Sequence, residues 1–258
     1  MISFLSGSNK TKCSTDLING FDMLKIVLNL ILLLTIQFFC ISEAYALTDL
    51  DVKQFLLKRE QLWPSWKLPK LSVSGLKQDL IYPNWFEGDW LVIAEDLDQV
   101  NKETTKYIVN FYKNETGNIV GNRSKNSESI GKAIFGEKLI KVKNDPKSFN
   151  NQIIYLSDNQ YIESRITGRS QILDSDLFFA DEFVIQTVYA PEASRVNQVE
   201  ILSKFYRCDI NEDLIQLDNK KDICGIQYSA TYGSKVGNTS VNAISTHKYK
   251  LTFKYLGN

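Results

Sequence analysis

The sequence contains a single histidine, His247, and this scarcity excludes most histidine-dependent active sites. A Ser-His-Asp triad would have to use that one residue, and no G-x-S-x-G motif accompanies it. A zinc site built from several histidines is impossible. Because His247 lies between Thr246 and Lys248 near the start of an expected strand, we interpret it as a surface residue.

Complete metal-binding motifs are lacking as well. The run Asp209-x-Asn211-x-Asp213 resembles the start of a calcium loop. However, Leu214 stands where the loop needs glycine, and Lys220 stands where it needs the bidentate glutamate. We therefore interpret the run as a turn, and we expect neither a metal nor a cofactor.

The chain also lacks a charge bias. Lys plus Arg and Asp plus Glu both number 30. No global field therefore favours nucleic acid, and we expect no nucleic-acid partner. Hydrophobic residues make up 43% of the chain and aromatic residues 12%, so it can bury a sizeable core and does not have the composition of a disordered protein.

One long apolar run, residues 26–41, carries no charge. Lys25 precedes it and Ala44-Tyr45-Ala46 follows, which is the order of a secretory signal peptide, with cleavage expected after Ala46. The alternative is an uncleaved anchor, but the run falls short of the ~20 apolar residues that a spanning helix needs. Met23 would give a signal of ordinary length, so we interpret 1–22 as an extension upstream of the true start and 23–46 as the signal peptide.

Only two cysteines, Cys208 and Cys224, follow the expected cleavage site. An even pair in an exported protein predicts a disulfide. In the loop-entropy model, closing a loop of this length contributes roughly 3 kcal/mol. The alternative, a redox-active pair, lacks the C-x-x-C spacing.

Short β-type segments separated by turns dominate the rest of the chain. We expect a short helix over 49–61, a second over 128–135, and an extended Trp- and Pro-rich stretch over 63–69 that covers one end of the domain. The expected strands are 90–97, 106–113, 119–122, 138–142, 152–156, 161–169, 183–189, 198–207, 223–233 and 248–255. An antiparallel meander closed into a single barrel removes their edges. The predicted class is mainly β, with an N-terminal segment over 47–81 and a barrel domain over 82–258.

Alternation along the first two long strands indicates which residues face inward. One face of each strand carries the apolar or aromatic set, namely Trp90, Val92, Ala94, Tyr107, Val109 and Phe111. If these residues point inward, the interior is apolar with few polar groups and suits a lipid, pigment or quinone. The alternative is a filled core without a cavity.

The segment Trp85-Phe86-x-Gly88-x-Trp90 resembles the G-x-W signature that opens the first strand of lipocalins and related calycins. The resemblance implies that Trp90 closes one end of a barrel against an arginine from a late strand. Arg207 is the better candidate for that arginine, and Arg195 is the second candidate. The guanidinium would stack on the indole.

The chain also resembles a family of exported cyanobacterial proteins with plastid relatives. The shared pattern is Tyr82-Pro-x-Trp-Phe-x-Gly-x-Trp90 followed by 129–133, 142–146, 152–156, 167–169, 196–200, 206–207 and 247–251. This resemblance covers about 82–255 and departs in the Lys- and Asn-rich stretch 208–247. It implies a lipocalin-like fold in the thylakoid lumen or periplasm, and it brings no known activity.

Three functions remain in view. The leading hypothesis is non-catalytic binding of a small apolar ligand, with Trp90, Val92, Tyr107, Val109 and Phe111 as the candidate ligand-binding residues. The second is an assembly or structural partner of a photosynthetic membrane complex, contacted through the Trp63–Trp90 region. The third is an enzyme on a calycin fold. Its only support in the sequence is scattered carboxylates and tyrosines, and we name no catalytic residue.

Overall fold

The computed structural model describes residues 49–68, 79–99, 104–145, 148–208, 222–235, 238–239 and 242–257. Residues 47–258 form one compact unit. The expected signal segment, its cleavage site after Ala46 and the turn over 209–213 lie outside the described residues. These three predictions therefore stay predictions.

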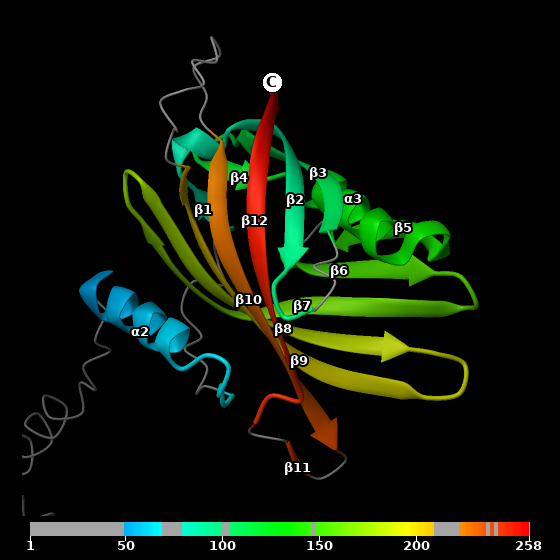
Figure 1. Ribbon diagram of the computed structural model, residues 1–258. Coiled ribbons are helices and arrows are strands. Elements are labelled where there is room, and N and C mark those ends of the chain that lie inside the picture. Colours follow the sequence, from blue (N-terminus) through cyan, green and yellow to red (C-terminus); the bar gives the residue numbers. More distant parts are fainter. Residues whose placement is uncertain are drawn as a thin grey trace, which may run out of the picture. The chain divides into compact units, whose positions relative to one another are not determined.

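The described chain is mainly β, as the sequence predicts (Figure 1). Its strands are β1 (Ile81–Tyr82), β2 (Gly88–Asp96), β3 (Thr104–Lys113), β4 (Ile119–Gly121), β5 (Leu139–Asp145), β6 (Ser148–Leu156), β7 (Gln160–Leu173), β8 (Leu177–Tyr189), β9 (Ser194–Arg207), β10 (Ile223–Lys235), β11 (Asn238–Thr239) and β12 (Ser245–Gly257). They pair antiparallel in the order β1-β4-β3-β2-β12-β10-β9-β8-β7-β6-β5, with β11 paired to β10. The sheet curls into a half-barrel, which is consistent with the predicted lipocalin-like barrel.

Side chains and one helix join parts of the sheet that are distant in strand order. Gln171 on β7 bonds both backbone groups of Ile81 on β1, at 3.3 and 3.5 Å. The helix α3 (Arg123–Phe135) packs against both β3 and β5. It begins at Asn122, whose side chain accepts from the Lys125 amide, and ends at Gly136, whose φ of 55° suits glycine. These contacts hold the curled sheet around its interior.

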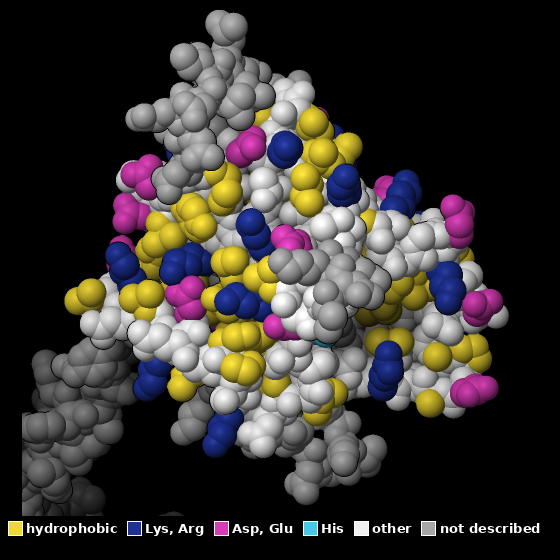
Figure 2. All heavy atoms as spheres, viewed as in Figure 1, with side chains coloured by type: hydrophobic (Ala, Val, Ile, Leu, Met, Phe, Trp, Pro, Cys, Tyr) yellow, Lys and Arg dark blue, Asp and Glu magenta, His cyan; other side chains and the backbone are white. Residues whose placement is uncertain are grey.

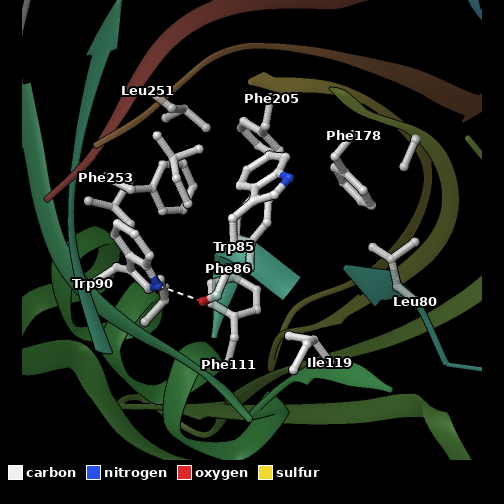
Figure 3. Packing of buried hydrophobic residues seen from close by; sticks show 14 of the residues in the cluster. Leu80, Trp85, Phe86, Trp90, Phe111, Ile119, Phe178, Phe205, Leu251 and Phe253 are labelled. Carbon is white, nitrogen blue, oxygen red and sulfur yellow. Dashed lines mark hydrogen bonds between the residues drawn. The ribbon is translucent and has the colours of Figure 1, made fainter. Parts of the chain in front are cut away.

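The inner face of the sheet carries a core rich in aromatic rings (Figure 3). Phe86, in the 3-10 helix η1 (Asn84–Phe86), is fully buried at its centre. Six aromatic rings surround it with centroid distances from 4.6 to 5.8 Å, those of Tyr82, Trp85, Phe111, Phe178, Phe205 and Phe253. Such rings bury large apolar areas, so this cluster stabilises the half-barrel at the end where η1 lies.

A second core lies on the opposite face of the sheet, beneath α2 (Asp49–Gln61). The helix has acidic residues in its first turn and basic residues in its last, which suits the helix dipole, and it packs on β7, β8 and β9. Trp66 follows it and is 1% exposed, with its ring near Trp63 and Tyr228. The expectation that this stretch covers a barrel end is wrong. It covers the outer face of the sheet. The ring partner of Trp66, Tyr228, points to this face, since its neighbour Gln227 lines the cavity on the inner face.

Candidate ligand-binding cavity

The inner face of the curled sheet lines a partly open cavity of about 450 Å³ next to the aromatic core. The apolar lining contains an aromatic group, Phe86, Phe111, Phe205 and Phe253, and an aliphatic group, Leu80, Val109, Ile130, Ile154, Ile166, Ala180, Val184, Ile201 and Leu251. The helix α3 also contributes to the lining. A volume of this size falls in the range of small-molecule sites.

The five residues predicted to bind a ligand divide into two groups. Tyr107, Val109 and Phe111 line the cavity. Trp90 and Val92 are fully buried in the inner core and are not part of the lining. The predicted inward face is therefore the observed one, but only its β3 half reaches the cavity.

The residues of the expected closing motif are held by backbone hydrogen bonds. Trp90 donates its indole N–H to the Phe86 carbonyl at 2.6 Å (Figure 3), and Trp85 donates to the Ser175 carbonyl at 3.0 Å. Gly88 has a φ of 119°, a conformation that glycine adopts without strain.

The structure does not bring Arg207 to the Trp90 indole. Arg207 is exposed at the end of β9, and the strands β10 and β12 separate β9 from β2. Tyr255 on β12 instead meets the indole edge-on, with ring centroids 5.1 Å apart. The expected arginine stacking is therefore wrong. The pairing register of β2 and β12 accounts for the contact between Tyr255 and Trp90, because the two residues lie directly opposite each other.

Charged side chains at the cavity occur in pairs of opposite sign. Arg123 of α3 bonds Asp79 through both Nε and Nη2. Arg169 of β7, which is 4% exposed, donates from Nε to Glu182 of β8 at 2.8 Å and forms an ion pair with the same carboxylate, with Nη2 2.7 Å away. Asp79, Arg123 and Glu182 line the cavity. Each of its charges therefore has a counterion.

Uncharged polar side chains complete the lining. They include the hydroxyls of Tyr82, Tyr107, Ser164 and Ser203 and the amides of Gln186 and Gln227, together with Asn126, Ser127, Asn150 and Gln152. Burial, together with the nearby Glu182 carboxylate, raises the pKa of Tyr82 well above its usual range. Burial also raises the pKa of Tyr107 to about 12. Both phenols are thus neutral near pH 7 and can donate a hydrogen bond. The apolar alternation along the first two long strands predicts few polar groups inside, and it gives no sign of this part of the cavity.

The lining changes character along the strands. Phe178 of β8 faces Phe205 of β9, within the aromatic core. Two residues further along β8, Ala180 faces Ser203, and Ser203 in turn faces Gln227 of β10. Further along β8 still, Gln186 faces Ser164 of β7. A bound molecule would meet aromatic rings at one end, and at the other end amides and hydroxyls together with the aliphatic side chains of Ile166 and Val184.

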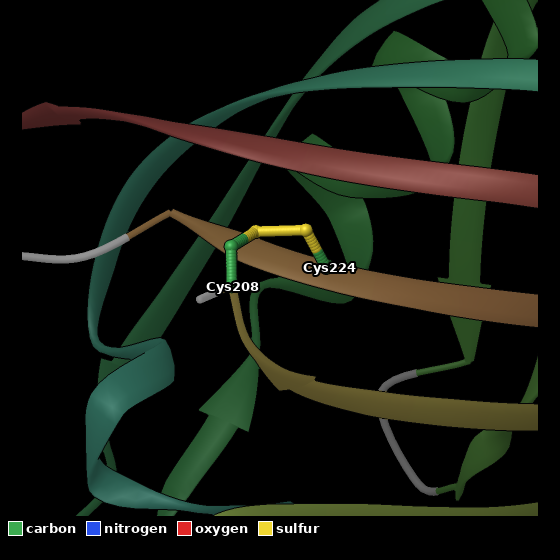
Figure 4. Close-up of a disulfide and its surroundings, with 2 residues drawn as sticks. All are labelled: Cys208 and Cys224. Atoms are coloured by element: carbon green, nitrogen blue, oxygen red, sulfur yellow. A yellow bond between two sulfur atoms is a disulfide. The ribbon is translucent and has the colours of Figure 1, made fainter. Parts of the chain in front are cut away.

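Cys208 and Cys224 are joined by a disulfide with an S–S distance of 2.04 Å (Figure 4). Cys208 follows β9 and Cys224 lies on β10, opposite Tyr206. The bond connects two neighbouring strands at the end where the aromatic core lies.

His247 lies beside a buried carboxylate. Its Nδ1 is 3.3 Å from Oδ2 of Asp96, and its side chain is 43% exposed while that of Asp96 is 7% exposed. Its ring stacks near Tyr249 at 6.0 Å. Among the described residues, no group of His, Cys, Asp and Glu could hold a metal ion.

A buried ionic cluster under α2 was not expected from the sequence. Arg59 bonds the fully buried Glu200 through two nitrogens, at 2.7 and 2.6 Å, and Tyr232 donates to the same carboxylate at 2.6 Å. Asp181 is also fully buried, and neither of its oxygens has a hydrogen-bond partner within the described part of the chain. Burial, the Glu200 carboxylate and Glu182 raise the pKa of Asp181, against the opposing effect of Arg59.

Surface charge shows no segregation by sign on the face in Figure 2, where basic and acidic side chains are interspersed. Within the described ranges, the structure contains no helix that is both long and apolar enough to cross a membrane.

The fold and the cavity together define a curled antiparallel half-barrel with an internal pocket. The chain belongs to the family described as "Domain of unknown function (DUF6816)", whose model matches residues 74–256. No curated protein and no solved structure matches the chain. The matched residues include all of the strands from β1 to β11 and most of β12, and therefore the cavity.

Proposed function

We propose that this protein binds one small molecule with an apolar body and a polar head inside the half-barrel. The observation that carries the proposal is the cavity of about 450 Å³, which is lined by aromatic rings at one end and by amides and hydroxyls towards the other. Apolar walls supply affinity through burial of the ligand, and a few placed polar groups fix its orientation. A lipid, a pigment or a quinone has this form.

The chemistry of the lining supports binding rather than acid–base catalysis. A general base needs a pKa near the working pH. Tyr82 and Tyr107 have raised pKa values, which keep their protons in place. The lining carboxylates of Asp79 and Glu182 are each bonded to an arginine. The lining therefore offers donors and acceptors for recognition.

The assembly hypothesis is weaker in the form that uses the tryptophan-rich region. Trp66, Trp85 and Trp90 are buried within the protein's own cores, and Trp63 is half-buried against Tyr228. A partner would have to displace these contacts before it could use the rings.

The proposed location is an exported compartment, the thylakoid lumen or the periplasm. The support is the signal-like run over 26–41, the resemblance to exported cyanobacterial proteins and the Cys208–Cys224 bond, which suits an oxidising compartment.

A cavity-filling variant tests the proposal. We expect the chain from Leu47 onward to bind a fluorescent apolar probe, and Ser203→Leu to weaken that binding at least about tenfold, because the added carbons occupy the ligand's space. Ser194→Leu, on the same strand but exposed, is the matched control and should bind as the wild type does. Equal binding by all three proteins, or no binding by any, would overturn the proposal.

A further inference from the structure

We infer that the head of the ligand is uncharged and bears carbonyl or hydroxyl oxygen atoms, as in a quinone, a fatty alcohol or an acylglycerol. This inference rests on the proposed function and narrows the class of ligand that the same cavity accepts. It excludes free fatty acids, other lipids with an anionic head, and alkylamines as preferred ligands.

The first support is the pairing of charge. Arg123 is bonded to Asp79, and Arg169 to Glu182. The four side chains sum to zero, two positive and two negative. An anionic head would have to break one of these pairs or remain without a counterion, and a cationic head faces the same choice. Burial of an unpaired charge is far more costly than burial of a neutral polar group.

The second support is the supply of uncharged hydrogen-bonding groups. Six lining side chains have no hydrogen-bond partner among the described residues, namely Tyr82, Tyr107, Ser164, Gln186, Ser203 and Gln227. Each carries a hydroxyl or an amide, which can donate to a carbonyl oxygen and accept from a hydroxyl. Each charge in the lining is bonded to a side chain of opposite charge, whereas these neutral groups remain available to a ligand.

A third observation concerns Gln152, which lies opposite Ser164 on the neighbouring strand. Its Nε2 donates to Ser127 at 2.8 Å and to Asn144 at 2.6 Å. These two bonds fix the amide with its carbonyl oxygen as the remaining acceptor. A hydroxyl head can donate to this oxygen, whereas a carboxylate head cannot.

A panel of ligands that share one alkyl chain tests the inference. A fatty alcohol, a monoacylglycerol, a fatty acid and an alkylamine are each titrated at pH 8 against the protein loaded with the apolar probe. We expect the alcohol and the monoacylglycerol to displace the probe at concentrations at least about tenfold lower than the two charged ligands. Equal potency across the panel, or tightest binding by the acid or the amine, would overturn the inference.

The two proposals fail in different ways. Probe binding that is lost in Ser203→Leu establishes the cavity, and the panel then reports the preferred head alone. If the probe binds and the fatty acid displaces it at the lowest concentration, only the inference of a neutral head fails. If neither the probe nor any member of the panel binds, both proposals fail.

A variant that removes one negative charge provides a second, independent test. Glu182→Gln removes the carboxylate that neutralises Arg169, so the cavity region gains a net positive charge. We expect the affinity for the fatty acid to rise about tenfold relative to that for the alcohol. Glu192→Gln, an exposed change in the turn after β8, is the matched control and should leave the ratio unchanged.

If Glu182→Gln does not fold, Asp79→Asn makes the same change at Arg123. An unchanged ratio of acid to alcohol affinity in a folded variant would contradict the inference.

Discussion

The indole nitrogen of Trp90 lies 2.6 Å from the carbonyl oxygen of Phe86, and this bond ties the first long strand to the short helix that carries the central ring of the core. Both residues are fully buried. The attachment of η1 to β2 therefore includes a buried backbone carbonyl that accepts a hydrogen bond from the Trp90 side chain in an apolar surrounding.

Replacing Trp90 with Phe should test this bond. The change removes the indole donor and leaves the buried Phe86 carbonyl without it, so we expect the free energy of unfolding to fall by about 2 kcal/mol or more. Urea denaturation measures the loss. Trp63→Phe is the control, because Trp63 is half-buried and none of its described contacts uses its N–H, and it should cost clearly less. A smaller loss in Trp90→Phe than in the control would contradict the account.

Gly225 allows Phe205 to lie across its strand. A Cβ at this position would come within 2.1 Å of the Phe205 ring and 2.6 Å of the Lys204 carbonyl oxygen. We expect Gly225→Ala to displace the ring and lower stability by about 1–3 kcal/mol, as overpacking does. In Gly121→Ala the nearest atom is 3.4 Å away, so this control should change stability less. Thermal unfolding of the two variants decides, and an unaffected Gly225→Ala would refute the packing of Phe205.

Reduction of the Cys208–Cys224 bond should lower stability by about 3 kcal/mol, because the open loop regains conformational entropy in the unfolded chain. Urea unfolding with and without reductant measures the difference. The double variant Cys208→Ser, Cys224→Ser should match the reduced protein in both conditions. The bond would be refuted if alkylation of the folded chain added the same mass before and after reduction.

Asp181 should give the protein a specific pH dependence. Its raised pKa means that the folded protein holds a proton that the unfolded chain, with an ordinary pKa of about 3.9, releases as the pH rises. The stability of the wild type should therefore fall relative to that of Asp181→Asn as the pH increases from 4 towards 8. Asp176→Asn, an exposed control, should show no such trend.

The measurement is urea unfolding at several pH values. A constant difference between Asp181→Asn and the wild type over this range would mean that Asp181 is ionised in the folded state, which contradicts its assignment as a neutral buried group.

Strand positions could be predicted well from the sequence where one face is buried and the other is exposed. The strand β3 was expected over 106–113 and runs over Thr104–Lys113, and its inward face is the predicted one. The strand β8 begins six residues before its expected start at 183. Its early residues Phe178 and Phe179 are both buried, one in each core, so the alternation on which the prediction depends is lost.

The polar part of the cavity could not be predicted for a related reason. The helix α2 covers the outer face of β9, so Glu200 and Leu202 are buried there while Ser203 faces the cavity. From the sequence alone, the buried Leu202 would be assigned to the inner face and the polar Ser203 to the outer face, which is the reverse of the observed arrangement. The partner that makes burial of Glu200 tolerable, Arg59, lies 141 residues away in the sequence, and no local pattern connects them.

The central claim is that a small neutral molecule occupies the cavity, and the most direct test is the protein purified from its own host. The soluble exported fraction would be extracted with organic solvent, and the extract analysed by mass spectrometry and absorbance. We predict that the extract contains a single uncharged amphiphile at a ratio of about one molecule per chain. The same molecule should be absent from the extract of Ser203→Leu purified in the same way. An extract without a stoichiometric molecule, or with one that Ser203→Leu retains in full, would contradict the claim.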